Sequence, residues 1–400
     1  MTLTLEETVG QTLMLAFEGT EPPPRVLKTI GTRHVGGFTL FRALNVESPE
    51  QVRGLTGALQ DAAVRSGQPP LLIGADQEGG QLMAIAGTTP FPGNMALGAS
   101  GSADLARRTG AALGRELAAV GVNVDYAPVC DVNVNPRNPN VGTRSFGEDP
   151  AAVVRLCAAM VEGLQSAGVA ATAKHFPGHG DATSDPHYGM PIVPHDYERL
   201  ARTAFPPFEA AVEAGVRMIM TTHVAFPGLN DGLALPSTLS TSALRGVLRH
   251  RMGFEGVIIS DAMDMVAIEQ GSGLIVDSLA AVAAGVDLLL LLDNPEAEEA
   301  IASALTQATE RRLLSLQRAQ ASAERVLALK RWVSGTEQPP LEVVGCPAHG
   351  RLASEAAERS VTLVRDDAGL LPLRLSAEDR VAVIVPRSVD LTPADTSSYV

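Results

Sequence analysis

Eight short apolar segments recur between residues 12 and 292, and segments of helical periodicity separate most of them. Most of the eight are apolar throughout, as expected of parallel strands that are covered on both faces. Strands that alternate with helices predict an α/β fold, and the count of eight favours a TIM-type (β/α)8 barrel over an open doubly wound sheet. The predicted strands are Thr12–Phe17, Gly37–Phe41, Leu71–Ala75, Val122–Ala127, Val169–Ala173, Met218–Thr222, Gly256–Ser260 and Val286–Leu292.

Helices are predicted where apolar residues recur at spacings of three and four between these segments. A glycine follows four of the predicted helices, in the place where a left-handed backbone ends a helix. The helices are Ser102–Val120, Asp149–Ala167, Tyr197–Ala214 and Ser272–Ala284, and the glycines are Gly121, Gly168, Gly215 and Gly285. A further charged helical stretch, Glu296–Trp332, is predicted to complete the barrel.

We expect the chain to divide into a barrel domain (1–333), a proline-containing linker (334–347) and a partial C-terminal α/β segment (348–400). In the last part we expect a helix from about Arg351 and strands at Ser360–Arg365 and Arg380–Val385. So few elements make a poor independent core. This part is therefore either the beginning of a second domain or an appendage packed on the barrel.

Charge and composition exclude several classes of partner. The net charge of −14 argues against binding to nucleic acid or to an anionic membrane surface. The three cysteines fit neither a zinc site nor a disulfide framework. The N-terminus lacks the basic region of a signal peptide, and no uncharged apolar stretch reaches the length of a membrane span. We therefore expect a cytoplasmic protein that uses no cofactor or metal.

Charged or imidazole side chains follow six of the eight predicted strands. In barrels of this type the chemistry is carried by the C-terminal ends of the strands. Any one aspartate of the set could equally be a helix N-cap, but so many costly polar groups at one face predict an enzyme. The set is Asp76 with Glu78, Asp131 with Arg144, Lys174 with His175, His223, Asp261 with Asp264, and Asp293.

The loop 174–191 (KHFPGHGDATSDPHYGMP) concentrates histidines and aspartates between glycines and prolines. Pro186 favours an extended backbone, in which the side chains of Asp185 and His187 point the same way. The carboxylate could then hold one nitrogen of the imidazole and leave the other free as a general acid and base. A zinc site built from His175, His179, His187 and Asp261 is the weaker alternative, because Lys174 and Arg144 would place positive charge beside the cation.

Five segments, in this order, resemble family 3 glycoside hydrolases, specifically the bacterial β-N-acetylglucosaminidase branch: VGGFTLFRALN (35–45), ADQEGG (75–80), VGTRSFGEDP (141–150), KHFPGHGDATSDPH (174–187) and VIISDAMDM (257–265). The resemblance implies that Asp261 is the nucleophile, and that His187 is the acid and base with Asp185 as its partner. It also implies that Asp76, Arg144, Lys174 and His175 bind the sugar. His223, at a strand end, is a further candidate for substrate binding. Gln81 stands where many relatives have arginine, which weakens the expectation of an acidic leaving group.

The resemblance implies hydrolysis of terminal β-linked N-acetylglucosamine with net retention, with peptidoglycan fragments as the expected source. An imidazole repels an incoming anion less than a carboxylate does, so phosphorolysis is a second expectation. A β-glucosidase or β-xylosidase of the same family and a non-catalytic sugar-binding barrel are the further alternatives.

Overall fold

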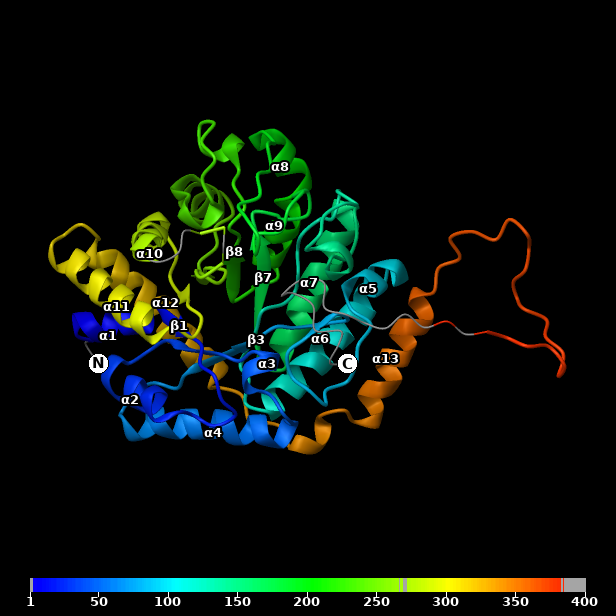
Figure 1. Ribbon diagram of the computed structural model, residues 1–400, viewed down its shortest axis with the longest axis horizontal. Coiled ribbons are helices and arrows are strands. Elements are labelled where there is room, and N and C mark those ends of the chain that lie inside the picture. Colours follow the sequence, from blue (N-terminus) through cyan, green and yellow to red (C-terminus); the bar gives the residue numbers. More distant parts are fainter. Residues whose placement is uncertain (1–2, 266, 269–271, 383, 385–400) are drawn as a thin grey trace.

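The eight predicted strands form one parallel sheet in the computed structural model, which describes residues 3–265, 267–268, 272–382 and 384. The sheet runs in the order β10-β1-β2-β3-β6-β7-β8-β9, and a parallel bridge between Ile259 and Leu288 joins its two edges into a barrel (Figure 1). The barrel prediction is therefore confirmed. The strands are β1 (Leu13–Leu15), β2 (Gly37–Thr39), β3 (Leu72–Ala75), β6 (Val124–Asp125), β7 (Ala170–Phe176), β8 (Met218–Thr221), β9 (Val257–Ile259) and β10 (Leu289–Leu290).

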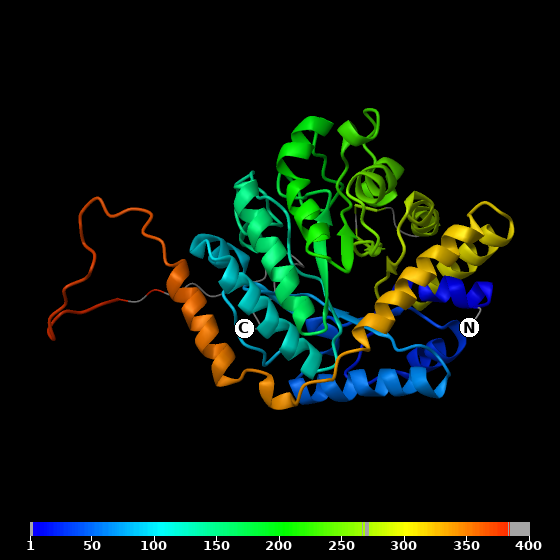
Figure 2. The same cartoon turned by 180° about the vertical axis from the view of Figure 1, so that it is seen from behind.

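Helices lie outside the ring of strands, as both views show (Figures 1 and 2). Those of the described residues include α1 (Leu5–Gln11), α2 (Pro24–Arg33), α3 (Arg42–Asn45), α4 (Pro49–Arg65), α5 (Asn94–Ser100), α6 (Ala103–Ala119), α7 (Pro150–Ser166), α8 (Tyr197–Thr203), α9 (Pro206–Glu213), α10 (Ser272–Ala284), α11 (Pro295–Glu310), α12 (Leu316–Val333) and α13 (Pro347–Ser360). The capping residues explain the starts of several: the side chains of Ser102 and Asp149 accept hydrogen bonds from backbone N–H groups of the first turns of α6 and α7.

Alternating residues of the strands serve two different cores. Met14 of β1 points into the barrel, whereas Leu13 and Leu15 pack against the surrounding helices. The interior is filled by apolar side chains such as Tyr126 and Met218. Three residues of α12 (Val326, Leu329 and Val333) belong to the same interior cluster, so this helix covers the N-terminal end of the barrel. The barrel is therefore solid below its C-terminal face.

Two predicted helices are each broken into two. The stretch Tyr197–Ala214 forms α8 and α9, because Pro206 and Pro207 have no N–H to donate into a continuous helix and Pro206 begins the second helix. The charged stretch forms α11 and α12, because Arg312 adopts a left-handed backbone (φ 60°) and Ser315 caps the second helix. Helical periodicity continues across both breaks and does not reveal them.

The segment after the barrel begins with a helix that packs on it. Helix α13 docks against α5 and α6, and its His349 Nδ1 lies 2.6 Å from a carboxylate oxygen of the buried Glu116 in α6. The strand predicted at Ser360–Arg365 is wrong: Ser360 ends α13, and residues 361–365 are exposed and form no ladder. A strand needs a partner, and none of the described residues provides one. The second predicted strand, Arg380–Val385, lies partly outside the described residues.

Candidate active site

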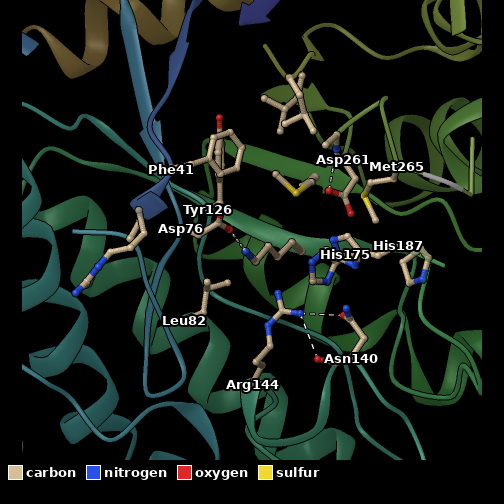
Figure 3. A pocket seen from close by; sticks show the side chains of 18 of the residues that line it. Phe41, Asp76, Leu82, Tyr126, Asn140, Arg144, His175, His187, Asp261 and Met265 are labelled. Atoms are coloured by element: carbon tan, nitrogen blue, oxygen red, sulfur yellow. Dashed lines mark hydrogen bonds and ion pairs between the residues drawn. The ribbon is translucent and has the colours of Figure 1, made fainter. Parts of the chain in front are cut away.

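A cavity of about 500 Å³ opens at the C-terminal end of the barrel strands. This volume is typical of sites for small molecules. Figure 3 shows Asp261 and His187 on one side of the cavity and Asp76, Tyr126 and Phe41 on the other. The charged, imidazole and amide residues that line it are Arg42, Asp76, Asn140, Arg144, Lys174, His175, His179, His187 and Asp261.

Asp261 follows β9 directly and faces the cavity with one end of its carboxylate held. Its Oδ1 accepts a hydrogen bond from the N–H of Ala262 at 2.9 Å. Burial opposes ionisation of this group, but the imidazoles of His175 and His187 and the hydrogen bond from the Ala262 N–H hold the pKa of Asp261 below its ordinary value. Asp261 is therefore ionised near neutral pH, as an attacking carboxylate must be.

His187 lies on the same wall, and Asp185 lies behind it, off the cavity surface. The Nδ1 atom of His187 is 2.6 Å from Asp185 Oδ1, and the His187 backbone N–H donates to the same oxygen at 2.9 Å. Burial alone would raise the pKa of Asp185, but these hydrogen bonds from His187 lower it to about 2. An ionised carboxylate can only accept, so Nδ1 carries a proton and Nε2 is left for chemistry.

The backbone around this pair differs from the prediction. Residues 186–188 form a turn, closed by the N–H of Tyr188 donating to the carbonyl oxygen of Asp185 at 3.0 Å. The expected extended backbone is therefore wrong. The two side chains meet because an aspartate side chain that accepts from the second residue after it stabilises a turn.

Two buried cations, Arg144 and Lys174, form the floor of the cavity, and the carboxylate of Glu78, for which the sequence predicts no role, holds both. Glu78, in the hairpin strand β4 (Gln77–Gly79), accepts from Arg144 Nε and Nη2 at 2.9 and 2.8 Å, and its Oε1 lies 2.7 Å from Lys174 Nζ. Lys174 Nζ also reaches Asp76 Oδ1 at 2.5 Å. Burial would raise the pKa of Glu78, but Arg144 and Lys174 lower it to about 2.

This network orders the groups that face the cavity. Burial alone would lower the pKa of Lys174, but Asp76 and Glu78 hold it above its ordinary value, so the ammonium stays charged. Arg144 Nη1 bonds Asn140 Oδ1 at 2.9 Å, which fixes the guanidinium plane from a second direction. Charged donors and acceptors in fixed positions suit the hydroxyls of a sugar.

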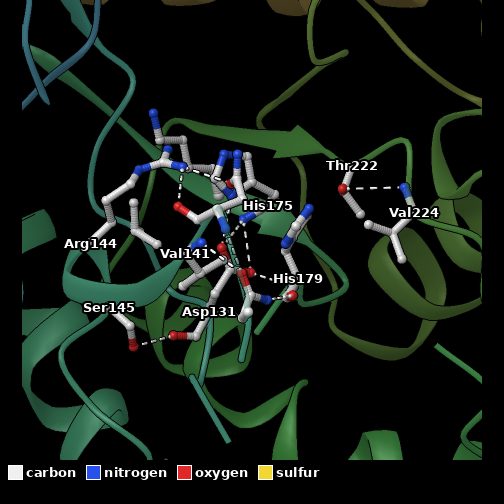
Figure 4. Close-up of polar contacts among 12 residues, drawn as sticks. Asp131, Val141, Arg144, Ser145, His175, His179, Thr222 and Val224 are labelled. Atoms are coloured by element: carbon white, nitrogen blue, oxygen red, sulfur yellow. Dashed lines mark hydrogen bonds and ion pairs between the residues drawn. The ribbon is translucent and has the colours of Figure 1, made fainter. Parts of the chain in front are cut away.

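A second buried carboxylate, Asp131, anchors two histidines of the long loop (Figure 4). Its Oδ2 lies 2.7 Å from His175 Nδ1, and its Oδ1 accepts from the backbone N–H of His179 at 2.6 Å. Asp131 is fully buried, so these bonds replace its hydration. His175 is thereby fixed with Nδ1 turned away from the cavity.

His223 is predicted as a substrate-binding residue, but the structure places it beneath the cavity. It is fully buried; its Nε2 lies 2.9 Å from the carbonyl oxygen of Ala262 and its Nδ1 lies 2.9 Å from Thr238 Oγ1. A carbonyl can only accept, so Nε2 donates and the ring supports the residue next to Asp261. Burial lowers the pKa of His223, which keeps the ring neutral.

Six of the predicted site residues thus line one cavity, and Asp185 and His223 stand behind it. The six are Asp76, Arg144, Lys174, His175, His187 and Asp261. Glu78 and Asp131 follow predicted strands, so their positions were visible in the sequence, but their bonding partners were not. Asn140 and the aromatic Tyr126 carried no signal that distinguishes them from ordinary loop and core residues.

Two other kinds of site are not found among the residues described. No cluster of three or more histidine, cysteine, aspartate or glutamate side chains there could hold a metal ion. Within the same residues, no helix combines the length and the apolar character that crossing a bilayer requires.

Comparison with known proteins agrees with this geometry. Residues 4–329 match the N-terminal domain of glycosyl hydrolase family 3. The chain is 35% identical to β-hexosaminidase A of Pseudoalteromonas piscicida, over 94% of this chain and 69% of that protein. It is 33% identical to a β-N-acetylglucosaminidase/β-glucosidase of Cellulomonas fimi, over 94% of this chain and 67% of that one. The solved family 3 β-N-acetylglucosaminidase of Paenibacillus sp. str. FPU-7 superposes with a TM-score of 0.87 at 41% identity, over 92% and 70% of the two chains.

Proposed function

The chain belongs to family 3 of the glycoside hydrolases, and from this membership we propose that it is a retaining β-N-acetylhexosaminidase. Its substrate would be a terminal β-linked N-acetylglucosamine, with fragments of peptidoglycan as one source. The observation that carries the proposal is that Asp261 and His187 share the wall of one cavity while Asp185 holds His187 from behind.

The first step forms a glycosyl-enzyme. A carboxylate oxygen of Asp261 attacks the anomeric carbon, and the bond from that carbon to the leaving oxygen breaks. The proton on Nε2 of His187 passes to the leaving oxygen. Asp185 keeps the other nitrogen protonated and stabilises the charged imidazolium before the transfer.

The second step releases the sugar. His187 Nε2 takes a proton from a water molecule, whose oxygen attacks the anomeric carbon and displaces Asp261. Two displacements at the same carbon retain its configuration. The same histidine thus acts first as acid and then as base.

The floor of the cavity would bind the sugar ring. Asp76 faces the end opposite to Asp261 and His187, where the hydroxyls remote from the reacting carbon would lie (Figure 3), and Lys174 is paired with Asp76. Phe41, Tyr126 and Leu82 line this same end and offer apolar surface to the faces of the ring.

Nitrophenyl glycosides test the proposal on the purified chain. We expect hydrolysis of the β-N-acetylglucosaminide in preference to the β-glucoside and β-xyloside, with the β-anomer appearing first by NMR. Asp261→Asn should lower kcat by about 10³-fold or more, because the nucleophile is lost.

Asp293→Asn is the matched control, because Asp293 also follows a strand but bonds Arg25 outside the cavity. This variant should keep the wild-type kcat. A preference for the glucoside would replace the proposal with a β-glucosidase. An α-anomer as first product would contradict the double displacement.

A further inference from the structure

One histidine of the cavity is not used by the mechanism above. His179 lines the cavity but is only 1% exposed, and neither ring nitrogen has a hydrogen-bond partner among the described residues. Buried polar side chains in native proteins nearly always have partners, and leaving one unpaired is costly. We therefore expect a ligand group to form the hydrogen bonds that the ring lacks.

The backbone fixes His179 on both sides. Its N–H donates to Asp131 Oδ1 at 2.6 Å, and its carbonyl oxygen accepts from Asn138 Nδ2 at 2.8 Å. Gly178 before it has φ +134°, which side chains rarely allow. A Cβ on Gly180 after it would lie 1.9 Å from the carbonyl oxygen of Val132. Two glycines thus place this histidine, and its position does not depend on bonds made by the ring.

The ring carries one donor and one acceptor. Burial lowers the pKa of His179 to about 4, so near neutral pH the ring has an N–H on one nitrogen and a lone pair on the other. A group that offers both an acceptor and a donor would satisfy it best.

The ring also lies toward the reacting end of the cavity. It stands beside His175, with 5.9 Å between the ring centroids (Figure 4). The charges of Asp131, His175, Arg144 and Asp261 act on it, and Asp76 lies at the end of the cavity opposite to Asp261 (Figure 3). The substituent next to the reacting carbon is the one on the second carbon of the sugar.

We propose that His179 is a further substrate-binding residue that contacts the 2-acetamido group and so selects N-acetylated sugars. The inference rests on the proposed function, because that function supplies the acetamido group. This group presents both an N–H and a carbonyl oxygen, so it can bond a nitrogen of the neutral ring in either tautomer. A 2-hydroxyl is shorter and would leave part of this bonding unmade.

Two variants test the proposal. His179→Phe keeps a ring of similar size and removes both polar atoms, and His179→Asn keeps a donor and an acceptor. We expect His179→Phe to lower kcat/KM for nitrophenyl β-N-acetylglucosaminide by about ten- to a hundredfold and to change that for the β-glucoside little. His179→Asn should recover part of the loss. His250→Ala, on an exposed residue outside the cavity, serves as the control and should leave both substrates unaffected.

The ratio of kcat/KM for the two substrates distinguishes a binding role of His179 from a purely structural role. A histidine needed only for folding would lower activity on both substrates together and lower the Tm, whereas His179→Phe should unfold no earlier than the wild type. Equal losses on both substrates, or no loss on either, would overturn the proposal.

Calorimetric titration with free N-acetylglucosamine and with glucose measures binding without catalysis. It therefore tests the role of His179 independently of the proposed function. If the wild type hydrolyses neither glycoside, the proposed function fails, but a preference for N-acetylglucosamine that His179→Phe abolishes still supports the role of His179. A preference that survives the substitution contradicts it, and so does a wild type that binds neither sugar.

Discussion

The backbone N–H of Ala267 donates a hydrogen bond to the carbonyl oxygen of Pro186 at 3.1 Å. Pro186 stands between Asp185 and His187, and Ala267 follows Asp261 in the loop after β9. The bond therefore ties the loop of the proposed acid to the loop of the proposed nucleophile. The distance between the two loops is therefore set by a main-chain contact as well as by the barrel. A reaction that uses one residue from each loop requires such fixed spacing.

Removal of the proposed acid should depend on the leaving group. His187→Ala should lower kcat for alkyl β-N-acetylglucosaminides by about 10²- to 10⁴-fold, because a poor leaving oxygen needs a proton. Nitrophenyl glycosides should lose much less in the first step. Steady-state rates on both substrate classes measure this difference. His195→Ala is the matched control, because His195 pairs with Asp181 in the same loop outside the cavity. Equal losses on both classes would argue against an acid role.

Glu78→Gln should destabilise the protein by about 3–5 kcal/mol at pH 7, because it leaves Arg144 and Lys174 buried with a neutral partner. In the wild type the pKa of Glu78 falls from 4.5 to about 2 on folding. This depressed value adds about 3 kcal/mol of stability above pH 4.5, which is lost as the pH falls toward 2.

Urea unfolding at several pH values tests this prediction. On acidification, the free energy of unfolding of Glu78→Gln should fall less than that of the wild type, because the variant lacks the carboxylate that becomes protonated. Glu162→Gln, which breaks the exposed ion pair with Arg107, should change stability little. A Glu78→Gln protein as stable as the wild type would contradict the role given to this carboxylate.

His223→Phe should lower kcat while KM stays close to the wild-type value. The ring does not line the cavity, but it donates to the carbonyl oxygen of Ala262 beside Asp261. His223→Gln, which can still donate, should recover part of kcat. Because burial lowers the pKa of His223, its contribution to stability is present above its unfolded value of 6.5 and is lost as the pH falls below it. A large rise in KM with unchanged kcat would assign His223 to substrate binding instead.

Phosphate should not replace water as the acceptor. An incoming phosphate needs a cation near the reacting carbon. Arg144 and Lys174 are each bonded to carboxylates, and Arg42, which also lines the cavity, donates to the carbonyl oxygen of Met83. We expect the free sugar as product in concentrated phosphate, measured by phosphorus NMR. A matched reaction in a non-nucleophilic buffer is the control. A glycosyl phosphate that rises with phosphate concentration would make the protein a phosphorylase.

The fold could be predicted from the sequence where apolar runs and glycines carry the information. All eight strand positions are confirmed, and Gly121, Gly168 and Gly215 adopt the left-handed backbone expected after a helix. The breaks at Pro206 and Arg312 were missed, because amphipathic spacing persists across a tight connection. The strand at Ser360–Arg365 was wrong because β-propensity describes a segment, whereas a strand also needs a neighbour.

The residues of the site could be predicted where they follow a strand or belong to a motif that resembles family 3. The contacts among them could not be predicted. Asp261 and His187 were expected to share a cavity, and they do. The bonds of Glu78 and Asp131 join residues more than 40 positions apart, so no local pattern shows them. His223 was expected to line the cavity because it follows a strand. A position after a strand does not distinguish a side chain that faces the cavity from one that packs beneath it.

The helix across the N-terminal end of the barrel has a consequence for how a long substrate would be handled. With Val326 and Leu329 of α12 packed into an interior already filled by the strands, no passage runs from the cavity through the barrel among the described residues. A polymer therefore cannot pass through the barrel, and in the part of the chain that the structure describes it reaches Asp261 and His187 from the C-terminal face.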